Sequence, residues 1–378
     1  MEFSIDRKYF LDKLTLVSRA IAPHSPLPVL NGIRIQLFED RMVLTGSDKE
    51  FTIQTTIRPD EESQLEIEQP GSTVVDSRIL LELIRRMNTT VLKVITSDGD
   101  LMRLSARDGN FDLIGREAAA YPDLALEQPQ THFQLPASLL KEIYEQTAYA
   151  ASEKNSRQVL MGINLQVGDG KIAATATDSY RLALKVAPLE TGETSFRVTI
   201  PTAPFGEAVH SFGSSEMIDT YVDRRKIQFV FGDTLIQSQL YEGNFPEAAR
   251  IIPVKYMSTL KVSAGELEGM LNRSTIYTSS SSSSGSIVPV QMNCSAEDVG
   301  MRVLSSDIGS CKQRLDSPVY QGDELSVSFN AKLMLDALRG LHSQDQVQLD
   351  FTGELRPIKI TNPDDPTLTM IVVPIRSS

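Results

Sequence analysis

Three hydroxyl–carboxylate pairs are the residues of this chain whose types and spacing could do chemistry. They are Ser47-Asp48, Thr177-Asp178 and Ser306-Asp307, and their aspartates lie about 129 residues apart. An aspartate can act as a general acid or base when it is held near a reacting group. One acid–base site would not require the same pair three times at an even spacing. The recurrence therefore indicates a repeated turn rather than a catalytic centre.

Other patterns that could support catalysis are equally weak. No H-E-x-x-H motif occurs, and Gly168-Asp169-Gly170-Lys171 lacks the glycine spacing of a Walker A loop. The four histidines are widely scattered, at positions 24, 132, 210 and 342. We therefore expect no enzyme activity, no cofactor and no metal.

Each pair belongs to a longer pattern that occurs three times. A helix-like run, an apolar strand-like run, the pair and a second helix-like run follow one another in the same order. The first helices begin near Asp6, Pro136 and Ser263, the apolar runs are Val29–Ile33, Val159–Ile163 and Ile287–Val290, and the second helices cover Asp76–Met87, Thr202–Phe212 and Asn330–Leu341. The period is too long for a solenoid repeat and matches the size of a folded domain. We predict three similar domains, residues 1–128, 129–254 and 255–378, with joints at Pro129 and Pro253.

The composition is that of an ordinary soluble globular protein, at 41% hydrophobic and 23% charged residues. No apolar run approaches the roughly 18 residues of a membrane helix, and the N-terminus does not resemble a signal peptide. Two cysteines, Cys294 and Cys311, favour a reducing cytoplasm. The net charge of −12 argues against nucleic-acid binding when taken alone. A basic lining inside an acidic exterior would still hold DNA, because the distribution of charge matters more than its sum.

The hydrophobic pattern indicates helices packed on antiparallel sheets. Phe10, Leu14, Val17 and Ile21 recur at helical spacing behind a predicted Asp6 N-cap. Short strands with alternating polarity are predicted at Ile33–Leu37, Met42–Thr45, Phe51–Ile57, Val91–Thr96, Lys171–Thr175, Lys226–Phe231, Gln346–Phe351 and Leu368–Val373. Two helices against an antiparallel sheet, repeated three times, give an α+β protein.

Four segments carry a family resemblance. They are ATDSYRLA at Ala176–Ala183, the run from Gly243-Asn244-Phe245-Pro246 to Arg250-Ile251-Ile252-Pro253, FNAKLMLDAL at Phe329–Leu338, and VVPIR at Val372–Arg376. With Leu27–Leu30 and Glu68–Gly71, they resemble the signature segments of the bacterial DNA polymerase III beta subunit, the sliding clamp. The resemblance covers essentially the whole chain, in order.

The resemblance implies three repeated DNA-clamp domains and a ring-forming head-to-tail dimer. Helices would line the hole and sheets would form the outer wall. Such a ring is a non-catalytic DNA polymerase processivity factor that encircles duplex DNA and slides on it without reading its sequence. It would tether the replicative polymerase alpha subunit, the clamp loader and other proteins with a clamp-binding motif. We expect a cytoplasmic, nucleoid-associated homodimer with no membrane contact.

The family match implies which residues face DNA. They are His24, Arg78, Arg85, Lys154, Arg157 and Gln158. His24 replaces a typical arginine, and Ala203 and His210 stand where the family often has lysine or arginine. These departures predict weak affinity for DNA. The alternative is that exposed basic residues on helices are simply solvated.

The match also implies a groove between domains two and three that takes apolar side chains of a partner peptide. Its residues are Thr177, Ser179, Tyr180, Arg181, Leu182, Pro246, Ile251, Leu355, Pro357, Ile371, Val373, Pro374, Ile375 and Arg376. The alternative is that Leu182, Ile251, Ile371 and Val373 only pack the core. Tyr180 replaces the family's usual histidine, and Ser377-Ser378 end the chain where a bulky residue is common.

Phe111 and Leu113 in domain one match the family's dimer seam, against Ile276 and Tyr277 in domain three. Phe111 could instead be a core aromatic. The six serines Ser279–Ser284 predict a mobile surface loop.

Two further functions stay open at this point. A relative of the clamp could keep the fold and serve as an inhibitor-tolerant decoy or a partner-binding scaffold, which the departures at His24, Ala203, Tyr180 and the serine run would allow. An unrelated repeat enzyme would require a clustered polar site.

Overall fold

The computed structural model describes residues 1–22, 25–97, 101–107, 109–190, 194–278, 288–306, 308–342 and 344–376. His24, the serine run Ser279–Ser284, Asp307 and Ser377-Ser378 lie outside these residues. The chain divides into two compact units, Met1–Leu140 with Ala203–Leu240, and Lys141–Thr202 with Tyr241–Ser378. No helix among the described residues is long and apolar enough to cross a membrane.

Two antiparallel sheets form the first unit. An eight-stranded sheet has the order β10-β15-β16-β17-β4-β3-β2-β6, and a five-stranded sheet has the order β5-β1-β7-β8-β9. The strands are β1 (Glu2–Asp6), β2 (Gly32–Leu37), β3 (Met42–Ser47), β4 (Phe51–Ile57), β5 (Glu66–Gln69), β6 (Gly71–Asp76), β7 (Val91–Thr96), β8 (Leu101–Ala106), β9 (Gly109–Ile114), β10 (Thr131–Pro136), β15 (Met217–Val222), β16 (Lys226–Phe231) and β17 (Thr234–Gln239).

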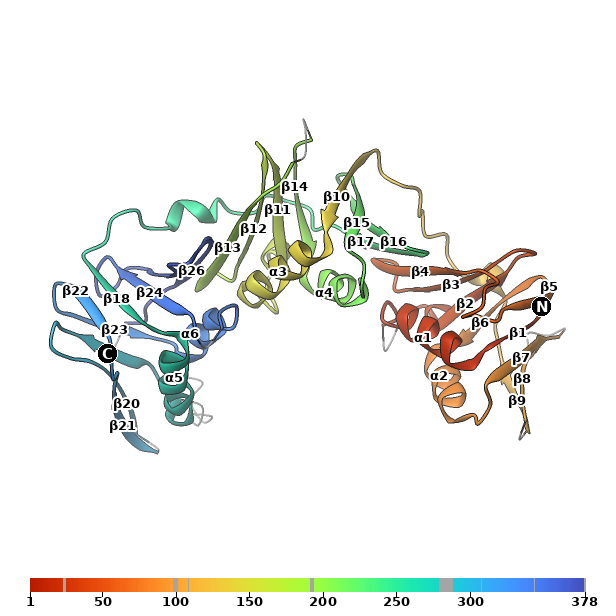
Figure 1. The fold of residues 1–378 in the computed structure, drawn as a ribbon, viewed down its shortest axis with the longest axis horizontal. Helices are drawn as coiled ribbons and strands as arrows, with labels where there is room; N and C mark the ends of the chain where they lie inside the picture. Colours follow the sequence, from red (N-terminus) through yellow and green to blue (C-terminus); the bar gives the residue numbers. More distant parts are fainter. Residues whose placement is uncertain are drawn as a thin grey trace. The chain divides into compact units, whose positions relative to one another are not determined.

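The helices of this unit begin where the sequence predicts. They are α1 (Arg7–Ser18), α2 (Ser77–Arg86) and α4 (Thr202–Ser211). The Asp6 carboxylate accepts a hydrogen bond from the Tyr9 amide at 2.8 Å, which confirms the predicted N-cap. The buried side chains Phe10, Leu14 and Val17 share one face of α1. This face packs against β3 and β4, while α2 lies beside α1 (Figure 1).

The second unit is built in the same way. Its sheets have the orders β14-β11-β12-β13-β26-β25-β24-β18-β22 and β21-β20-β19-β23. The strands are β11 (Gly162–Gly168), β12 (Lys171–Thr177), β13 (Arg181–Pro188), β14 (Phe196–Pro201), β18 (Ser258–Ser263), β19 (Val290–Cys294), β20 (Val299–Ser305), β21 (Gly309–Arg314), β22 (Val319–Gly322), β23 (Leu325–Phe329), β24 (Gln346–Phe351), β25 (Ile358–Asn362) and β26 (Asp365–Val372). The helices are α3 (Ala137–Thr147), which begins in the first unit, α5 (Ala264–Thr278) and α6 (Ala331–Leu338).

Both large sheets cross a predicted joint between domains. In the first unit β17 pairs with β4, from Thr234↔Thr55 to Ser238↔Phe51. In the second unit β13 pairs with β26, from Arg181↔Val372 to Lys185↔Leu368. Backbone pairing of this kind joins neighbouring predicted domains, and this is why three sequence repeats form two compact units.

The apolar runs predicted as strands are partly wrong. Pro28–Asn31 and Gln158–Met161 each form a short 3₁₀ helix, η1 and η4, before the strand begins at Gly32 or Gly162. Proline at the first position of η1 fixes φ near the helical value. The Leu160 amide donates to the Arg157 carbonyl at 3.0 Å, so the chain turns before it enters the sheet.

Residues 124–127, just before the predicted joint at Pro129, form a linker without regular structure that side chains of the first unit hold in place. The Gln228 amide nitrogen donates to the carbonyls of Leu126 and Glu127 at 3.1 and 3.2 Å. Gln237 donates to the Leu124 carbonyl at 3.3 Å, and Lys226 donates to the Ala125 carbonyl at 2.6 Å. The segment without regular structure is therefore fixed to β16 and β17.

Candidate functional site

The hydroxyl–carboxylate pairs form a repeated turn. The Asp178 carboxylate accepts hydrogen bonds from the amides of Tyr180 and Arg181 at 2.9 and 3.0 Å, and Thr177 Oγ1 donates to the Arg181 carbonyl at 2.6 Å. Asp48 accepts from the amides of Glu50 and Phe51 at 3.0 and 2.7 Å. In both turns these hydrogen bonds occupy the aspartate with local backbone amides. The predicted repeated turn is confirmed for the first two pairs, and Asp307 of the third lies outside the described residues.

An apolar cluster lies beside the second turn. Its buried members are Val159, Leu160, Leu182, Phe245 and Ile371, and Leu184, Tyr241 and Ile252 pack against them. The register of β13 and β26 places Leu182 directly opposite Ile371. Sequence reasoning named those two and missed the other three buried members. The signal was present, since Val159 and Leu160 open the second apolar run and Phe245 belongs to a quoted segment.

The predicted groove residues differ in their exposure. Leu182 and Ile371 are fully buried, and Thr177 is 5% exposed. Tyr180, Ile251 and Leu355 are exposed large apolar side chains, at 66%, 49% and 58%. Ser179 and Arg376 are exposed, whereas Pro246, Pro357, Val373, Pro374 and Ile375 are half-buried.

Two backbone bonds bring the C-terminal segment to this place. The Val373 amide donates to the Tyr180 carbonyl at 2.8 Å, and the Ile375 amide donates to the Ser328 carbonyl at 2.7 Å. The turn, the apolar cluster and the C-terminal residues are thus neighbours.

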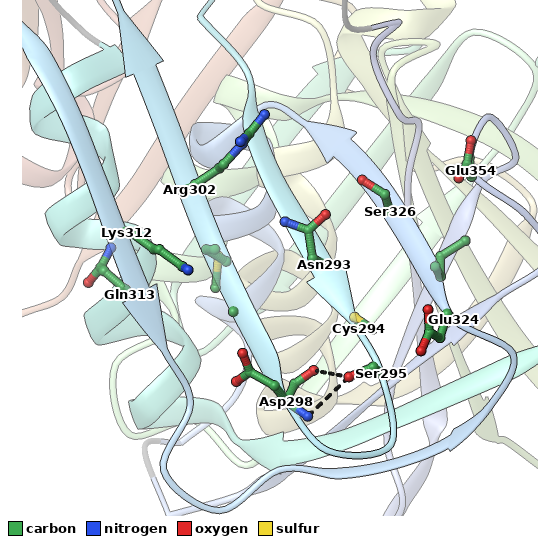
Figure 2. A pocket seen from close by; sticks show the side chains of 13 residues that line it. Asn293, Cys294, Ser295, Asp298, Arg302, Lys312, Gln313, Glu324, Ser326 and Glu354 are labelled. Carbon is green, nitrogen blue, oxygen red and sulfur yellow. Dashed lines mark hydrogen bonds between the residues drawn. The ribbon is translucent and has the colours of Figure 1, made fainter.

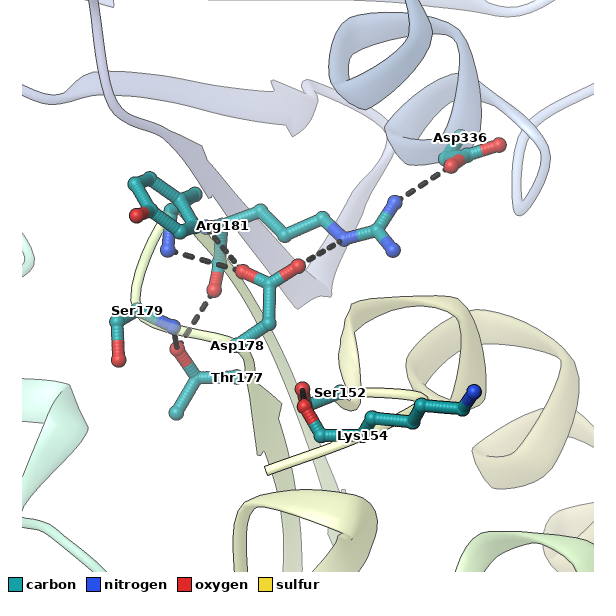
Figure 3. A network of polar contacts seen from close by, with 8 residues as sticks. Ser152, Lys154, Thr177, Asp178, Ser179, Arg181 and Asp336 are labelled. Atoms are coloured by element: carbon teal, nitrogen blue, oxygen red, sulfur yellow. Dashed lines mark hydrogen bonds and ion pairs between the residues drawn. The ribbon is translucent and has the colours of Figure 1, made fainter. Parts of the chain in front are cut away.

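Arg181 lies in a network of polar contacts (Figure 3). Its guanidinium donates to Asp178 Oδ2 at 3.0 Å and to Asp336 Oδ2 of α6 at 2.5 Å. The side chain of Arg181 is 12% exposed and that of Asp336 is 7% exposed. The guanidinium carbon also lies 5.6 Å from the centre of the Tyr149 ring. Neither Asp336 nor Tyr149 was identified from the sequence as a site residue, although Asp336 belongs to the quoted segment Phe329–Leu338.

The basic residues predicted to face DNA are all exposed where they are described. Arg78 and Arg85 lie on α2, and Arg85 and Arg86 both pair with Glu82, at 3.1 and 2.6 Å. Lys154, Arg157 and Gln158 lie between η3 (Ala148–Ala150) and the end of η4.

The predicted seam residues lie at or near the edges of sheets. Phe111 and Leu113 are half-buried on β9, the last strand of its sheet, opposite the buried Leu104 and Met102. Ile276 on α5 is 64% exposed, and Tyr277 packs against the core of the second unit. This unit also has an edge strand, β21, next to α5.

A polar cavity of about 450 Å³ lies on the four-stranded sheet of the second unit (Figure 2). Its lining mixes Arg302 and Lys312 with Asp298, Glu324 and Glu354. The Cys294 thiol also lies there, and burial raises its pKa to about 12. This thiol therefore stays protonated at neutral pH and is a poor nucleophile.

Comparison with known proteins defines the class. Models of the DNA polymerase III beta subunit match residues 1–125 (N-terminal domain), 134–247 (central domain) and 249–376 (C-terminal domain). Beta sliding clamps of Staphylococcus epidermidis and Staphylococcus aureus are 31% and 30% identical over 380 residues, covering all of both chains. The DNA polymerase sliding clamp of Bacillus subtilis superimposes with a TM-score of 0.93 at 28% identity. The beta chain of Streptococcus pneumoniae gives 0.95 at 25% identity, and each match covers both chains entirely.

The fold is thus that of a DNA clamp built from three related domains. The chain belongs to the DNA polymerase III beta subunit family, the beta sliding clamps. This membership confirms the predicted role of a non-catalytic processivity factor.

Proposed function

We propose that two copies of this chain close head to tail around duplex DNA and tether replication and repair proteins to it. The full-length match to sliding clamps carries this proposal. The proposed domains are residues 1–128, 129–254 and 255–378. Action on chromosomal DNA would place the ring in the cytoplasm with the nucleoid.

The edge strands support the head-to-tail arrangement. Strands β9 and β21 each end their sheet among the described residues, so each offers a free row of backbone donors and acceptors. Pairing of two different edges is a heterologous contact, and it forms a ring when the rotation closes. Phe111 and Leu113 would meet Ile276 and Tyr277 at this seam.

Weak phosphate contacts suit a ring, because topology retains the DNA. Arg78, Arg85, Lys154 and Arg157 would supply sequence-independent contacts, with Gln158 and His24 beside them. Arg78 forms no ion pair with any described residue, so its charge is available. Glu82 offsets part of the charge of Arg85.

The groove would take the apolar side chains of a partner peptide. Its floor is the buried cluster around Leu182 and Ile371, and exposed apolar side chains such as Tyr180 and Ile251 supply the contact surface. The replicative polymerase alpha subunit, the clamp loader and other proteins with a clamp-binding motif are the proposed partners.

Retention on DNA tests the ring. The chain is loaded onto nicked circular DNA, isolated with it, and the circle is then cut. We expect the protein to stay on the circle and to leave the linear form. A chain that shows no topological retention contradicts the ring and favours a partner-binding scaffold.

Peptide binding tests the groove. We expect a fluorescein-labelled synthetic peptide with leucine and phenylalanine side chains to bind the wild-type chain, and Ile251→Asp to abolish that binding. Phe38→Asp, at another exposed apolar position (38% exposed), serves as the control. Equal binding by wild type and Ile251→Asp contradicts the proposed groove.

A further inference from the structure

The two faces of strand β13 have different partners. Leu182 and Leu184 belong to the apolar cluster of the proposed groove. Arg181 and Lys185 lie on the opposite face, because side chains alternate along a strand. In the register with β26 they stand opposite Val372 and Leu368, both of which belong to the large core of the second unit. The cations therefore lie behind the proposed groove floor.

The ion pairs of Arg181 with Asp178 and Asp336 lie at one end of the β13–β26 ladder. Asp178 holds the guanidinium from the turn, and Asp336 holds it from α6, which lies in the third predicted domain. Arg339 also reaches the Asp336 carboxylate, at 3.2 Å. Asp178 also accepts a hydrogen bond from the Tyr180 amide. The same carboxylate therefore fixes both the Arg181 guanidinium and the backbone that carries the exposed Tyr180 side chain.

The ion pairs of Lys185 with Glu142 and Asp365 lie at the other end of this ladder. This lysine is 3% exposed, and its ammonium donates to Glu142 at 2.5 Å, to Thr367 Oγ1 at 2.6 Å and to Asp365 at 3.4 Å. The three acceptors match the three donors of an ammonium group. Glu142 comes from α3, and the other two come from β26, so this cation also bridges two predicted domains.

We propose that Arg181 and Lys185 are positioning residues that fix the two halves of the groove relative to each other before a peptide arrives. This inference rests on the proposed groove. It gives Arg181 a positioning role in place of the expected peptide contact, since two carboxylates already pair with its guanidinium. A site that is preorganised binds more tightly because less order has to be created on binding.

The test removes each cation together with its nearest carboxylate, at 2.5 Å in both pairs, which limits the uncompensated charge left behind. Arg181→Met/Asp336→Leu and Lys185→Met/Glu142→Gln are compared with wild type for affinity to the labelled peptide. We expect each double variant to raise the peptide Kd about tenfold, by analogy with other losses of preorganisation. The Tm should change little. The control Arg41→Gln/Asp40→Asn removes an exposed pair at 2.9 Å and should leave the Kd unchanged.

Amide hydrogen exchange measures local opening at the groove separately from global stability. The Val373 amide bonds to the Tyr180 carbonyl, so loss of the Arg181 pair should speed its exchange while core amides such as that of Leu349 stay protected. If one double variant does not fold, the other tests the same inference.

The outcomes separate the two proposals. A wild-type chain that fails to bind the peptide overturns the groove and this inference with it. Binding by wild type with an unchanged Kd in the folded double variants overturns only the positioning role.

Discussion

At the scale of single residues, the second turn combines backbone strain with several fixed hydrogen bonds. Ser179 has φ of +80°, and Lys49 has φ of +84° at the corresponding position of the first turn. Residues other than glycine rarely adopt this region. The four local hydrogen bonds of the turn offset the strain, so the shape was predictable from the Thr177-Asp178 pattern although the strain was not.

Ser179→Gly should stabilise the chain by about 0.5–1 kcal/mol, because glycine relieves left-handed strain and loses part of that gain to a freer unfolded chain. Ser179→Val should destabilise it, since a β-branched residue is disfavoured at this φ. The free energy of unfolding in urea checks both. A lower stability for the glycine variant would contradict the strain.

Tyr149 carries a buried hydroxyl without a hydrogen-bond partner among the described residues. Burial raises its pKa far above the ordinary value, so the group stays neutral. Tyr149→Phe should be neutral or stabilising by about 1 kcal/mol, because an unpaired buried polar group is costly. Tyr149→Ala should cost about 3–5 kcal/mol by analogy with other aromatic truncations. A clear loss of stability in the phenylalanine variant would reveal a partner for the hydroxyl.

Asp365 makes a pH-dependent contribution to the stability of the folded chain. Burial raises its pKa, but the Thr367 hydroxyl and amide and the Lys185 ammonium outweigh burial and hold the pKa below the ordinary 3.8. A depressed folded pKa means that the stabilisation is fully present above the unfolded value and is lost as pH falls through the folded one. Between pH 5 and 3, wild type should therefore lose more stability than Asp365→Asn, as measured by urea unfolding at each pH. Parallel pH profiles would contradict this.

At the scale of elements, the regular strands were predictable and the contacts between distant segments were not. Three predicted strands match the structure residue for residue: Val91–Thr96 is β7, Lys226–Phe231 is β16 and Gln346–Phe351 is β24. Alternating polarity is typical of a half-buried strand, which is why the sequence predicts these bounds. By contrast, Arg181 and Asp336 are 155 residues apart. Their pairing depends on where β13 and α6 pack, which no local pattern encodes.

The helix ends show the same limit. The last helix was predicted to reach Leu341, yet α6 ends at Leu338 and is followed by single turns at Arg339 and Leu341. Gly340 follows closely, and glycine favours the end of a helix. The apolar stripe continues past the point where regular hydrogen bonding stops.

The linker contacts of Gln228 give a prediction at this scale. Gln228→Met should remove the hydrogen bonds to Leu126 and Glu127 and cost about 1–3 kcal/mol, because the buried side-chain oxygen of Gln237 loses its Gln228 donor as well. Limited proteolysis should then cut residues 124–127 faster. Gln239→Met, at an exposed position one strand away, is the control. Equal cutting rates would mean that Gln228 does not hold the linker.

At the scale of the whole molecule, the proposed seam is open to a direct test. Ile276→Asp places a charge on a 64% exposed apolar side chain of α5. Sedimentation velocity should show a monomer, because a buried charge without a partner disfavours the interface. Met217→Asp, at a 46% exposed position in the first unit, should leave the dimer intact. If the Ile276→Asp variant is still a dimer, Ile276 does not lie in the interface and the proposed seam is wrong.

The continuous sheets at β17–β4 and β13–β26 have a mechanical consequence. Each joint holds five residue pairs of an antiparallel ladder, so separating two predicted domains within the chain would shear a row of backbone bonds at once. The free edges β9 and β21 have no such ladder until a second copy supplies it. Within one copy the covalent chain also links the domains, whereas nothing covalent would link two copies, so under load a ring made from this chain should part between copies first.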